Sequence, residues 1–255
     1  MRLATFNILS GRSPGKEHTD VGRLAAAIRQ LDADVLGLQE VDRAQERSQH
    51  ADLTAVAAEA MGAVDHQFVA SLHGMPGATW TAPTGVDQPD SAAYGIALLS
   101  RHRVRSWEVV RLPPLPGRAP WLFDGSRRPS LVRDEPRVAV IATVEAPAGP
   151  VTVATTHLSF LHGWNVVQLR RAVRALAGHD GPRVLMGDLN MSPATATRFS
   201  GMAPAVSAPT FPVGRPTRQI DHVLVDGLPP RLRPGHGEAC DLGLSDHRAL
   251  VVDLG

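Results

Sequence analysis

The sequence of 255 residues has one cysteine, few aromatic residues, no excess of either charge and no long hydrophobic run. A single thiol, Cys240, excludes an internal disulfide and a zinc site built from several cysteines. With 26 basic and 25 acidic side chains, the chain lacks the overall positive charge of many nucleic-acid-binding proteins. No apolar run is long enough for a transmembrane helix, and the run at the N-terminus is too short for a signal peptide. We therefore expect a cytoplasmic protein with no transmembrane segment and no disulfide-linked partner.

The remaining composition is typical of a folded globular protein. Hydrophobic residues make up 43% of the chain and charged residues 20%, which permits a substantial core. No Gly/Ser-rich linker divides the sequence. We therefore expect residues 1–255 to form a single domain, and we expect a monomer.

Short apolar runs recur along the chain, as expected for buried strands. They cover residues 3–9, 35–38, 68–72, 95–99, 138–144, 151–155, 184–186, 220–225 and 250–254. Three helices are predicted: one after a capping Asp20, one over 53–61 and one over 164–177. Strands that alternate with a few helices, together with a hairpin-like pair at 138–144 and 151–157, predict an α/β domain with mixed sheets.

The stretch 111–136 is the least regular part of the sequence and is rich in Pro and Arg. Loops of this length in compact domains are usually functional or mobile. Trp121 could stack on a base or enter a lipid interface, or it could simply pack over its own sheet. Together with Arg137, the residues Arg127, Arg128 and Trp121 are our candidates for substrate binding.

Polar side chains repeatedly follow apolar strands. The sequence reads TFN up to Asn7, LQE up to Glu40, TTH up to His157, and GDLN from Gly187 to Asn190. In α/β sheets, ligand sites gather at the carboxyl ends of parallel strands. Two more groups, QIDH around Asp221 and SDH ending at His247, precede strands. If the last strand is antiparallel to its neighbours, all these groups can converge on one edge.

Such a cluster has a definite chemistry. Carboxylate and amide oxygens form a hard ligand set that suits Mg²⁺ or Mn²⁺; they belong to Asn7, Glu40, Asp188, Asn190 and Asp246. Histidines near neutral pH can donate to phosphoryl oxygens or relay protons, and a carboxylate behind a histidine fixes its tautomer. A metal, an acid that activates water and imidazoles that bind phosphate together indicate phosphoester hydrolysis.

The motifs TFN, LQEVD, TTHL, GDLN, QIDHVL and SDH, in this order, resemble those of the endonuclease/exonuclease/phosphatase superfamily with its DNase I-like fold. Each motif alone is also typical of turns or solvated loops, but six in order are specific. The resemblance spans Thr5 to His247, nearly the whole chain. It implies a four-layer α/β sandwich, in which two packed mixed β-sheets are flanked by helices.

The same resemblance implies roles for the metal site. Asn7 and Glu40 would bind the divalent metal, with Glu40 as the principal ligand and Asp246 nearby. The expected cofactor is Mg²⁺, with Mn²⁺ as the alternative.

It also implies catalytic roles. Asp188 would orient or deprotonate the attacking water, and Asn190 would hold that water and the phosphate. Asp221 would pair with His247, the acid/base that contacts the phosphate, while His157 would stabilise charge in the transition state. The other histidines, His162 among them, are expected to be structural or on the surface.

The fold does not determine the substrate. The interpretation favoured by the composition is a metal-dependent hydrolase that uses metal-activated water on a small-molecule or lipid phosphodiester or phosphomonoester. A nuclease acting on DNA or RNA is the first alternative, and it would need a basic groove beside the metal. A catalytically silent binding protein of the same fold is the second, although every expected catalytic position is filled.

Overall fold

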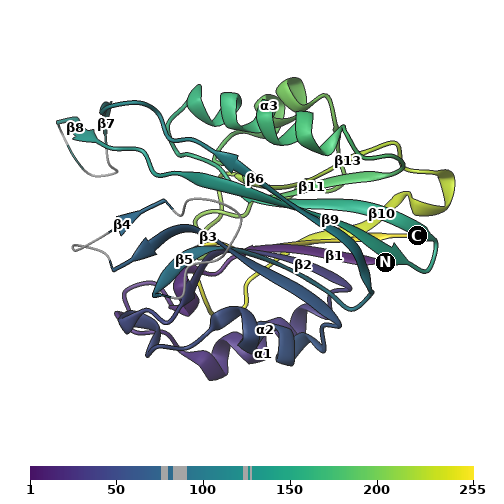
Figure 1. Ribbon diagram of the computed structural model, residues 1–255, viewed down its shortest axis with the longest axis horizontal. Helices are drawn as coiled ribbons and strands as arrows, with labels where there is room; N and C mark the ends of the chain where they lie inside the picture. Colours follow the sequence, from purple (N-terminus) through teal and green to yellow (C-terminus); the bar gives the residue numbers. More distant parts are fainter. Residues whose placement is uncertain (76–79, 83–90, 123–125, 127) are drawn as a thin grey trace.

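The computed structural model describes residues 1–75, 80–82, 91–122, 126 and 128–255. Two β-sheets pack face to face, and helices cover both outer faces (Figure 1). This arrangement confirms the predicted four-layer α/β sandwich with two mixed sheets. Among the described residues, no helix combines the length and the apolar character that crossing a bilayer requires.

The first sheet has seven strands in the order β14-β15-β1-β2-β5-β3-β4. Its parallel pair is β1 with β2, and the other pairings are antiparallel. The last strand, β15, is antiparallel to β1, as the convergence of the motifs required. The strands are β1 Arg2–Asn7, β2 Val35–Arg43, β3 Asp65–Gly74, β4 Trp80–Thr81, β5 Ala93–Ser100, β14 Pro234–Cys240 and β15 Ala249–Leu254.

The second sheet has six strands in the order β12-β13-β11-β10-β9-β6. It also has one parallel pair, β10 with β11, and the predicted hairpin β9–β10 is present. A separate two-stranded sheet joins β7 to β8. The strands are β6 Val104–Leu112, β7 Ala119–Trp121, β8 Ser130–Val132, β9 Arg137–Ala146, β10 Gly149–His157, β11 Arg183–Asp188, β12 Ala203–Pro204 and β13 Asp221–Asp226.

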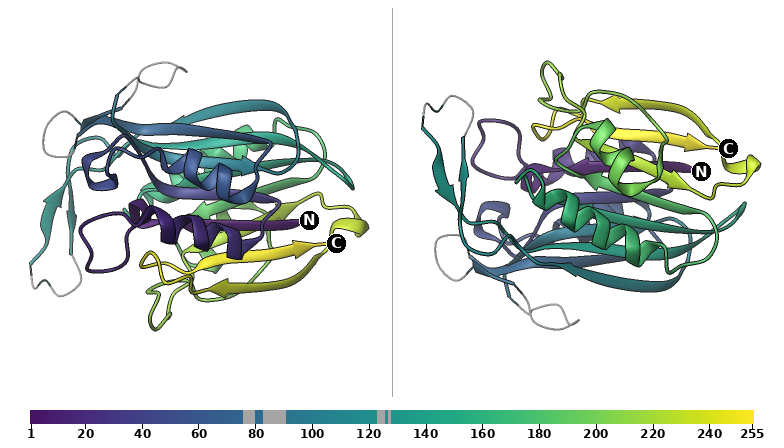
Figure 2. Two further views of the ribbon diagram at one scale, coloured as in Figure 1. Left: turned by 90° about the horizontal axis from the view of Figure 1, so that it is seen from below. Right: turned by 90° about the horizontal axis from the view of Figure 1, so that it is seen from above.

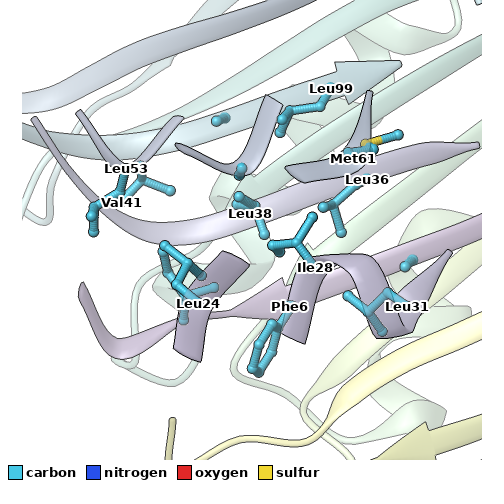
Figure 3. Packing of buried hydrophobic residues seen from close by; sticks show 14 of the residues in the cluster. Phe6, Leu24, Ile28, Leu31, Leu36, Leu38, Val41, Leu53, Met61 and Leu99 are labelled. Atoms are coloured by element: carbon cyan, nitrogen blue, oxygen red, sulfur yellow. The ribbon is translucent and has the colours of Figure 1, made fainter. Parts of the chain in front are cut away.

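Local sequence explains the helices. Helix α1 (Val21–Leu31) begins where the Asp20 side chain accepts a hydrogen bond from Arg23 N, and its buried residues Leu24, Ala27, Ile28 and Leu31 recur at helical spacing. Helix α2 (Leu53–Met61) is capped by Asp52 and ends at Gly62 in the left-handed conformation. These helices cover the outer face of the first sheet, where Phe6, Leu38 and Leu99 pack beneath them (Figure 3). Helices α3 (Trp164–Leu176) and α4 (Pro193–Ser200) cover the second sheet.

Strand β6 is the longest element that the apolar runs did not predict. Its apolar residues are interrupted by Arg105, Ser106, Glu108 and Arg111, and it lies at the edge of the second sheet with the first three of these exposed. A half-exposed edge strand has no continuous apolar run, which is why this pattern escapes detection. Likewise, the stretch 111–136 is not a plain loop, because it contains β7 and β8.

A third core lies between the sheets, where β1 faces β11 and β2 faces β10. The sheets lie close together at Gly37, where an added Cβ would lie 2.4 Å from Thr155 Oγ1. Just above it, the buried amide of Gln39 donates to Thr5 Oγ1 at 3.0 Å and to Thr155 Oγ1 at 3.1 Å. This polar link ties the two parallel pairs together directly beneath their carboxyl ends.

Candidate active site

The carboxyl ends of the two parallel pairs form one site. Strand β1 ends at Asn7, β10 ends at His157 and β11 ends at Asp188, while Glu40 lies on β2. The antiparallel strand β13 begins at Asp221, which pairs in register with Asp188. These ends lie opposite the chain termini, on the side from which β7 and β8 project (Figures 1 and 2).

A β-bulge directs Glu40 into this site. The register between β2 and β5 shifts between Gln39 and Val41, and Glu40 has a left-handed φ of 55°. Before the bulge, Leu36 and Leu38 pack toward the helices, whereas after it Val41 does so. Regular alternation would point Glu40 toward the helices with Leu38, so the extra residue is what turns its side chain toward the cleft. Left-handed residues of this kind are costly and cluster at functional sites.

Asp188 lies at the centre of the cluster. Its Oδ2 accepts a hydrogen bond from Asn7 Nδ2 at 3.1 Å and lies 3.4 Å from His157 Nε2 and 3.8 Å from His247 Nε2. Its Oδ1 accepts a hydrogen bond from Asn190 N at 3.0 Å. Burial and the charge of Asp221 raise the pKa of Asp188 from its ordinary value to about 7. A carboxyl group with such a pKa can exchange a proton near neutral pH.

Gly187 permits the close approach that places Asp188. It has a φ of 144°, and an added Cβ would lie 1.9 Å from Thr156 O on the neighbouring strand. Only glycine fits there. The glycine of GDLN is therefore required by the packing of β11 against β10, whereas the aspartate supplies the carboxylate of the site.

Asn7 joins the two sheets' carboxylates. Its Nδ2 donates to Glu40 Oε1 at 3.2 Å as well as to Asp188, and its Oδ1 accepts a hydrogen bond from Leu9 N. The amide nitrogen of Asn7 therefore faces the acids. The prediction that Asn7 is a metal ligand requires its oxygen to do so instead. Burial raises the pKa of Glu40, and the nearby charge of Asp246 raises it further.

Asp221 and His247 form a buried pair, with Asp221 Oδ2 2.9 Å from His247 Nδ1. Burial alone would lower the pKa of His247, but the charge and hydrogen bond of Asp221 outweigh it and raise the pKa to about 10. The turn before His247 is fixed by Ser245, whose Oγ donates to Asn7 O and accepts from His247 N. Asp246, in the same turn, is half-buried and close enough to act on Glu40 and His247 through its charge.

His157 is in the opposite protonation state. Burial, together with the charges of Arg137 and His247, lowers its pKa well below the ordinary value. Arg137 Nη1 lies 3.3 Å from His157 Nδ1, so Nδ1 is the acceptor and Nε2 carries the proton that points toward Asp188. One neutral and one cationic imidazole therefore flank the same carboxylate.

Asn190 is held by backbone contacts on both sides. It has a left-handed φ of 51°, its Nδ2 donates to Leu158 O at 3.0 Å, and its own carbonyl accepts a hydrogen bond from Asn165 Nδ2 at 2.8 Å. Its side chain lines the cleft beside Asp188.

The site opens into a cleft of about 1130 Å³. Two of the four predicted substrate-binding residues, Arg137 and Trp121, line it. Arg128 is exposed and is not among the described lining residues, so the structure does not bring it to the site. Arg127 lies outside the described residues.

Sequence reasoning missed several residues that line the cleft: Tyr94, Phe160, His162, Phe211 and Arg218. Phe160 and His162 directly follow the carboxyl end of β10, so the rule that located His157 could have found them. Phe211 gave no such signal, because it is placed by the fold beside His247, with ring centroids 4.9 Å apart.

The donor set fits a hard divalent cation. Asp188, Asp221 and His247 offer ligand atoms that lie within 4.8 Å of one another. Asp221 Oδ1 is buried and, within the described part of the chain, has no hydrogen-bond partner. The raised pKa values of Asp188 and Glu40 reflect burial and carboxylate repulsion, which a cation would relieve. This group differs from the predicted ligands Asn7, Glu40 and Asp246. Because a protonated His247 paired with Asp221 cannot bind a cation, the carboxylates Glu40, Asp188 and Asp246 remain as the candidate ligands, and Asn7 connects the first two.

Two mixed sheets with catalytic-type side chains at their shared edge define a DNase I-like sandwich. A model of the endonuclease/exonuclease/phosphatase family matches residues 4–247. The chain therefore belongs to this family. No curated protein matches the sequence.

Solved structures share the fold over the whole chain. An endonuclease/exonuclease/phosphatase from Beutenbergia cavernae is 26% identical with a TM-score of 0.70, covering 100% of this chain and 71% of that one. A mannosyl-6-phosphatase from Bacteroides thetaiotaomicron is 16% identical with a TM-score of 0.65, covering 100% and 99%. A humanized D. rerio TDP2 is 13% identical with a TM-score of 0.64, covering 100% and 98%. The last two likenesses establish the fold alone.

Proposed function

We propose that the protein is a divalent-metal-dependent phosphoesterase that hydrolyses a small-molecule or lipid phosphate ester. Members of the family are typically hydrolases of phosphate esters and generally depend on a divalent metal. The observation that carries the proposal is the placement of Asp188 between His157 and His247, with Glu40 joined to it through Asn7.

Each residue then has a role in the reaction. The water oxygen attacks phosphorus, the water proton passes to Asp188, and the bond between phosphorus and the alcohol oxygen breaks. The departing oxygen takes a proton from His247, so a monoester gives the alcohol and phosphate, and a diester gives the alcohol and a phosphomonoester. Asp221 keeps His247 protonated and oriented, and Asn190 holds the water against the phosphoryl group.

The remaining side chains stabilise the negative charge of the transition state or hold the cation that would do so. His157 donates from Nε2 and stabilises charge that develops in the transition state, and Arg137 holds its tautomer. Glu40, with Asn7 and Asp246 beside it, would hold Mg²⁺ or Mn²⁺, which would supply positive charge to the phosphoryl oxygens.

The charges that line the cleft favour a small phosphate ester as the substrate over a long nucleic acid. Its described lining carries Arg137 and Arg218 but also Glu40, Glu135 and Asp188. Arg137 is in addition paired with Glu135, at 3.4 Å. A nuclease needs a basic track that neutralises several phosphates, and this mixed lining is not one.

The test is a hydrolysis screen of the purified protein with Mg²⁺, Mn²⁺ or EDTA. The substrates are p-nitrophenyl phosphate, bis-p-nitrophenyl phosphate, sphingomyelin and supercoiled plasmid, and Asp188→Asn is the inactive control. We expect turnover of a small or lipid ester that EDTA and Asp188→Asn abolish. Plasmid cleavage alone would establish the nuclease alternative, and no metal-dependent turnover of any substrate would indicate a silent binding protein.

A further inference from the structure

The cleft is much larger than a phosphoryl group. Its volume of about 1130 Å³ slightly exceeds the usual range for pockets that hold drug-sized ligands. Glu40, Asp188, His157 and His247 line the part of the cleft where the phosphoryl group is expected, so the other lining residues would contact the alcohol part of the ester. Their side chains therefore carry information about the substrate.

One wall is aromatic. Trp121, on β7, meets Phe160 edge to face, with ring centroids 5.0 Å apart and an interplanar angle of 67°. It meets His162 in the same way, at 5.4 Å and 72°. All three rings line the cleft, and Trp121 and Phe160 are only half-buried. An edge-to-face contact leaves ring faces available for a further ring.

The two other aromatic residues of the described lining, Tyr94 and Phe211, are already engaged. Tyr94 is buried, and the guanidinium of Arg47 lies over its ring at 5.5 Å from the centroid. The ring of Phe211 contacts His247, and the guanidinium of Arg218 lies over it at 4.9 Å from the centroid. These contacts hold His247 and leave Phe211 less able to receive a ligand ring. Trp121, Phe160 and His162, here called the aromatic subsite, are therefore the better platform.

The segment that carries Trp121 is fixed at both ends. We call the described residues of the stretch 113–134, which include β7 and β8, the arm. At one end, Pro113 O accepts hydrogen bonds from Trp164 Nε1 and Gln168 Nε2, both at 3.1 Å. At the other, the two oxygens of Asp134 accept from Leu115 N at 2.8 Å and Ser159 Oγ at 2.6 Å.

These contacts tie the arm to α3 and to the loop that carries Phe160 and His162. The two halves of the aromatic subsite thus share one anchor, Ser159, which directly precedes Phe160. A platform that is held before the ligand arrives loses little entropy on binding. The anchors make the subsite a preorganised wall of the cleft.

We infer that the aromatic subsite binds the alcohol part of the substrate and selects an ester whose alcohol carries a flat aromatic group. This inference rests on the proposed phosphoesterase function, because it assumes that the phosphoryl group lies at Asp188. An aryl group and a nucleobase share the required flat face, and the test separates them.

The test measures affinity and does not require turnover. Isothermal titration calorimetry of the protein with Mg²⁺ compares ethylphosphonate with 2-(2-naphthyl)ethylphosphonate, which share the phosphonate and differ in the aromatic group. We expect the naphthyl compound to bind roughly 5- to 100-fold more tightly, the range that stacking on aromatic side chains supplies. Trp121→Ala and Phe160→Ala should each lower this ratio toward one, and Trp121→Phe should restore most of it.

Leu131→Ala is the matched control. Leu131 is on β8 of the same arm, is 66% exposed and is not among the described cleft residues, so its variant should keep the wild-type ratio. A nucleoside 5′-phosphonate is the third ligand to be titrated. If it binds more tightly than the naphthyl compound, the flat group is a nucleobase.

Equal affinities for ethylphosphonate and the naphthyl compound in the wild-type protein, or no binding of either, would overturn the subsite. A ratio that survives both alanine variants would do the same. Failure of the proposed function looks different: the naphthyl preference and its dependence on Trp121 would be present, but no ester would be hydrolysed.

Discussion

Asp221 and His247 approach each other from different sheets. Asp221 begins β13 of the second sheet, His247 precedes β15 of the first, and their side chains meet at 2.9 Å in a buried contact. Because the carboxylate holds the imidazole as a cation, we expect the two residues to act as a single unit in turnover.

Removing His247 should lower kcat by roughly 10²- to 10⁴-fold, the usual contribution of a positioned acid or base. Asp221→Ala should cost less by itself and little more once His247 is gone, because coupled residues are not additive. The measurement is kcat under saturating Mg²⁺ for His247→Ala, Asp221→Ala and the double variant. Losses that multiply in the double variant would mean that the contact has no role in the reaction.

Glu40→Gln should abolish stabilisation by Mg²⁺. A ligand at 100 times its Kd stabilises the folded state by about 2.7 kcal/mol, which is visible as a rise in Tm. The wild-type Tm should rise with Mg²⁺, whereas the Tm of Glu40→Gln should not respond. Glu59→Gln, an exposed carboxylate on α2, is the control and should respond like the wild type. An unchanged response in Glu40→Gln would place the metal elsewhere.

The metal-free protein should lose stability as pH rises above about 6.5. The folded pKa of His247 is about 10, above its ordinary value of 6.5, so the folded state binds the proton more tightly than the unfolded state. The stabilisation is complete below pH 6.5 and is lost as pH rises through about 10. The raised pKa of Asp188 acts in the same direction, but between its ordinary value of 3.8 and about 7.

Urea unfolding in EDTA between pH 6.5 and 9 measures this slope. One proton corresponds to at most about 1.4 kcal/mol per pH unit. His247→Gln should remove most of the slope in this window, while His66→Gln, at an exposed position, should retain it. A flat wild-type profile would show that His247 is not held as a cation.

Gly187→Ala should be severely destabilising or prevent folding. The new Cβ would fall 1.9 Å from Thr156 O, at a φ of 144° that alanine avoids. Gly22→Ala is the contrast, because Gly22 lies in α1 with space for a Cβ and should gain up to about 1 kcal/mol. Chemical denaturation of both variants provides the comparison. Wild-type stability in Gly187→Ala would mean that β11 can move away from β10.

Much of the fold was predictable because buried strands and capped helices have local signals. Each predicted apolar run overlaps a strand, and the helix over 53–61 has the predicted bounds. The strand-end rule also brought Asn7, His157 and Asp188 to one edge, because both sheets carry a parallel pair there.

The features that could not be predicted depend on contacts between segments that are distant in sequence. The bulge that turns Glu40 toward the cleft leaves no mark in LQEVD, since it is a matter of register against β5. The contact of Trp121 with Phe160 joins segments that are distant in sequence, and it depends on how the arm is anchored. The pKa values of the two histidines likewise follow from neighbours contributed by other strands.

The division of the site between the two sheets also determines when during folding the site can form. The first sheet brings Asn7, Glu40 and His247, and the second brings His157, Asp188 and Asp221. A folding intermediate with only one sheet formed would possess only part of this set of acids and one of the two imidazoles. Enzymatic competence should therefore arise abruptly, at the step in which the sheets dock, and refolding kinetics followed by turnover should lag behind those followed by secondary structure.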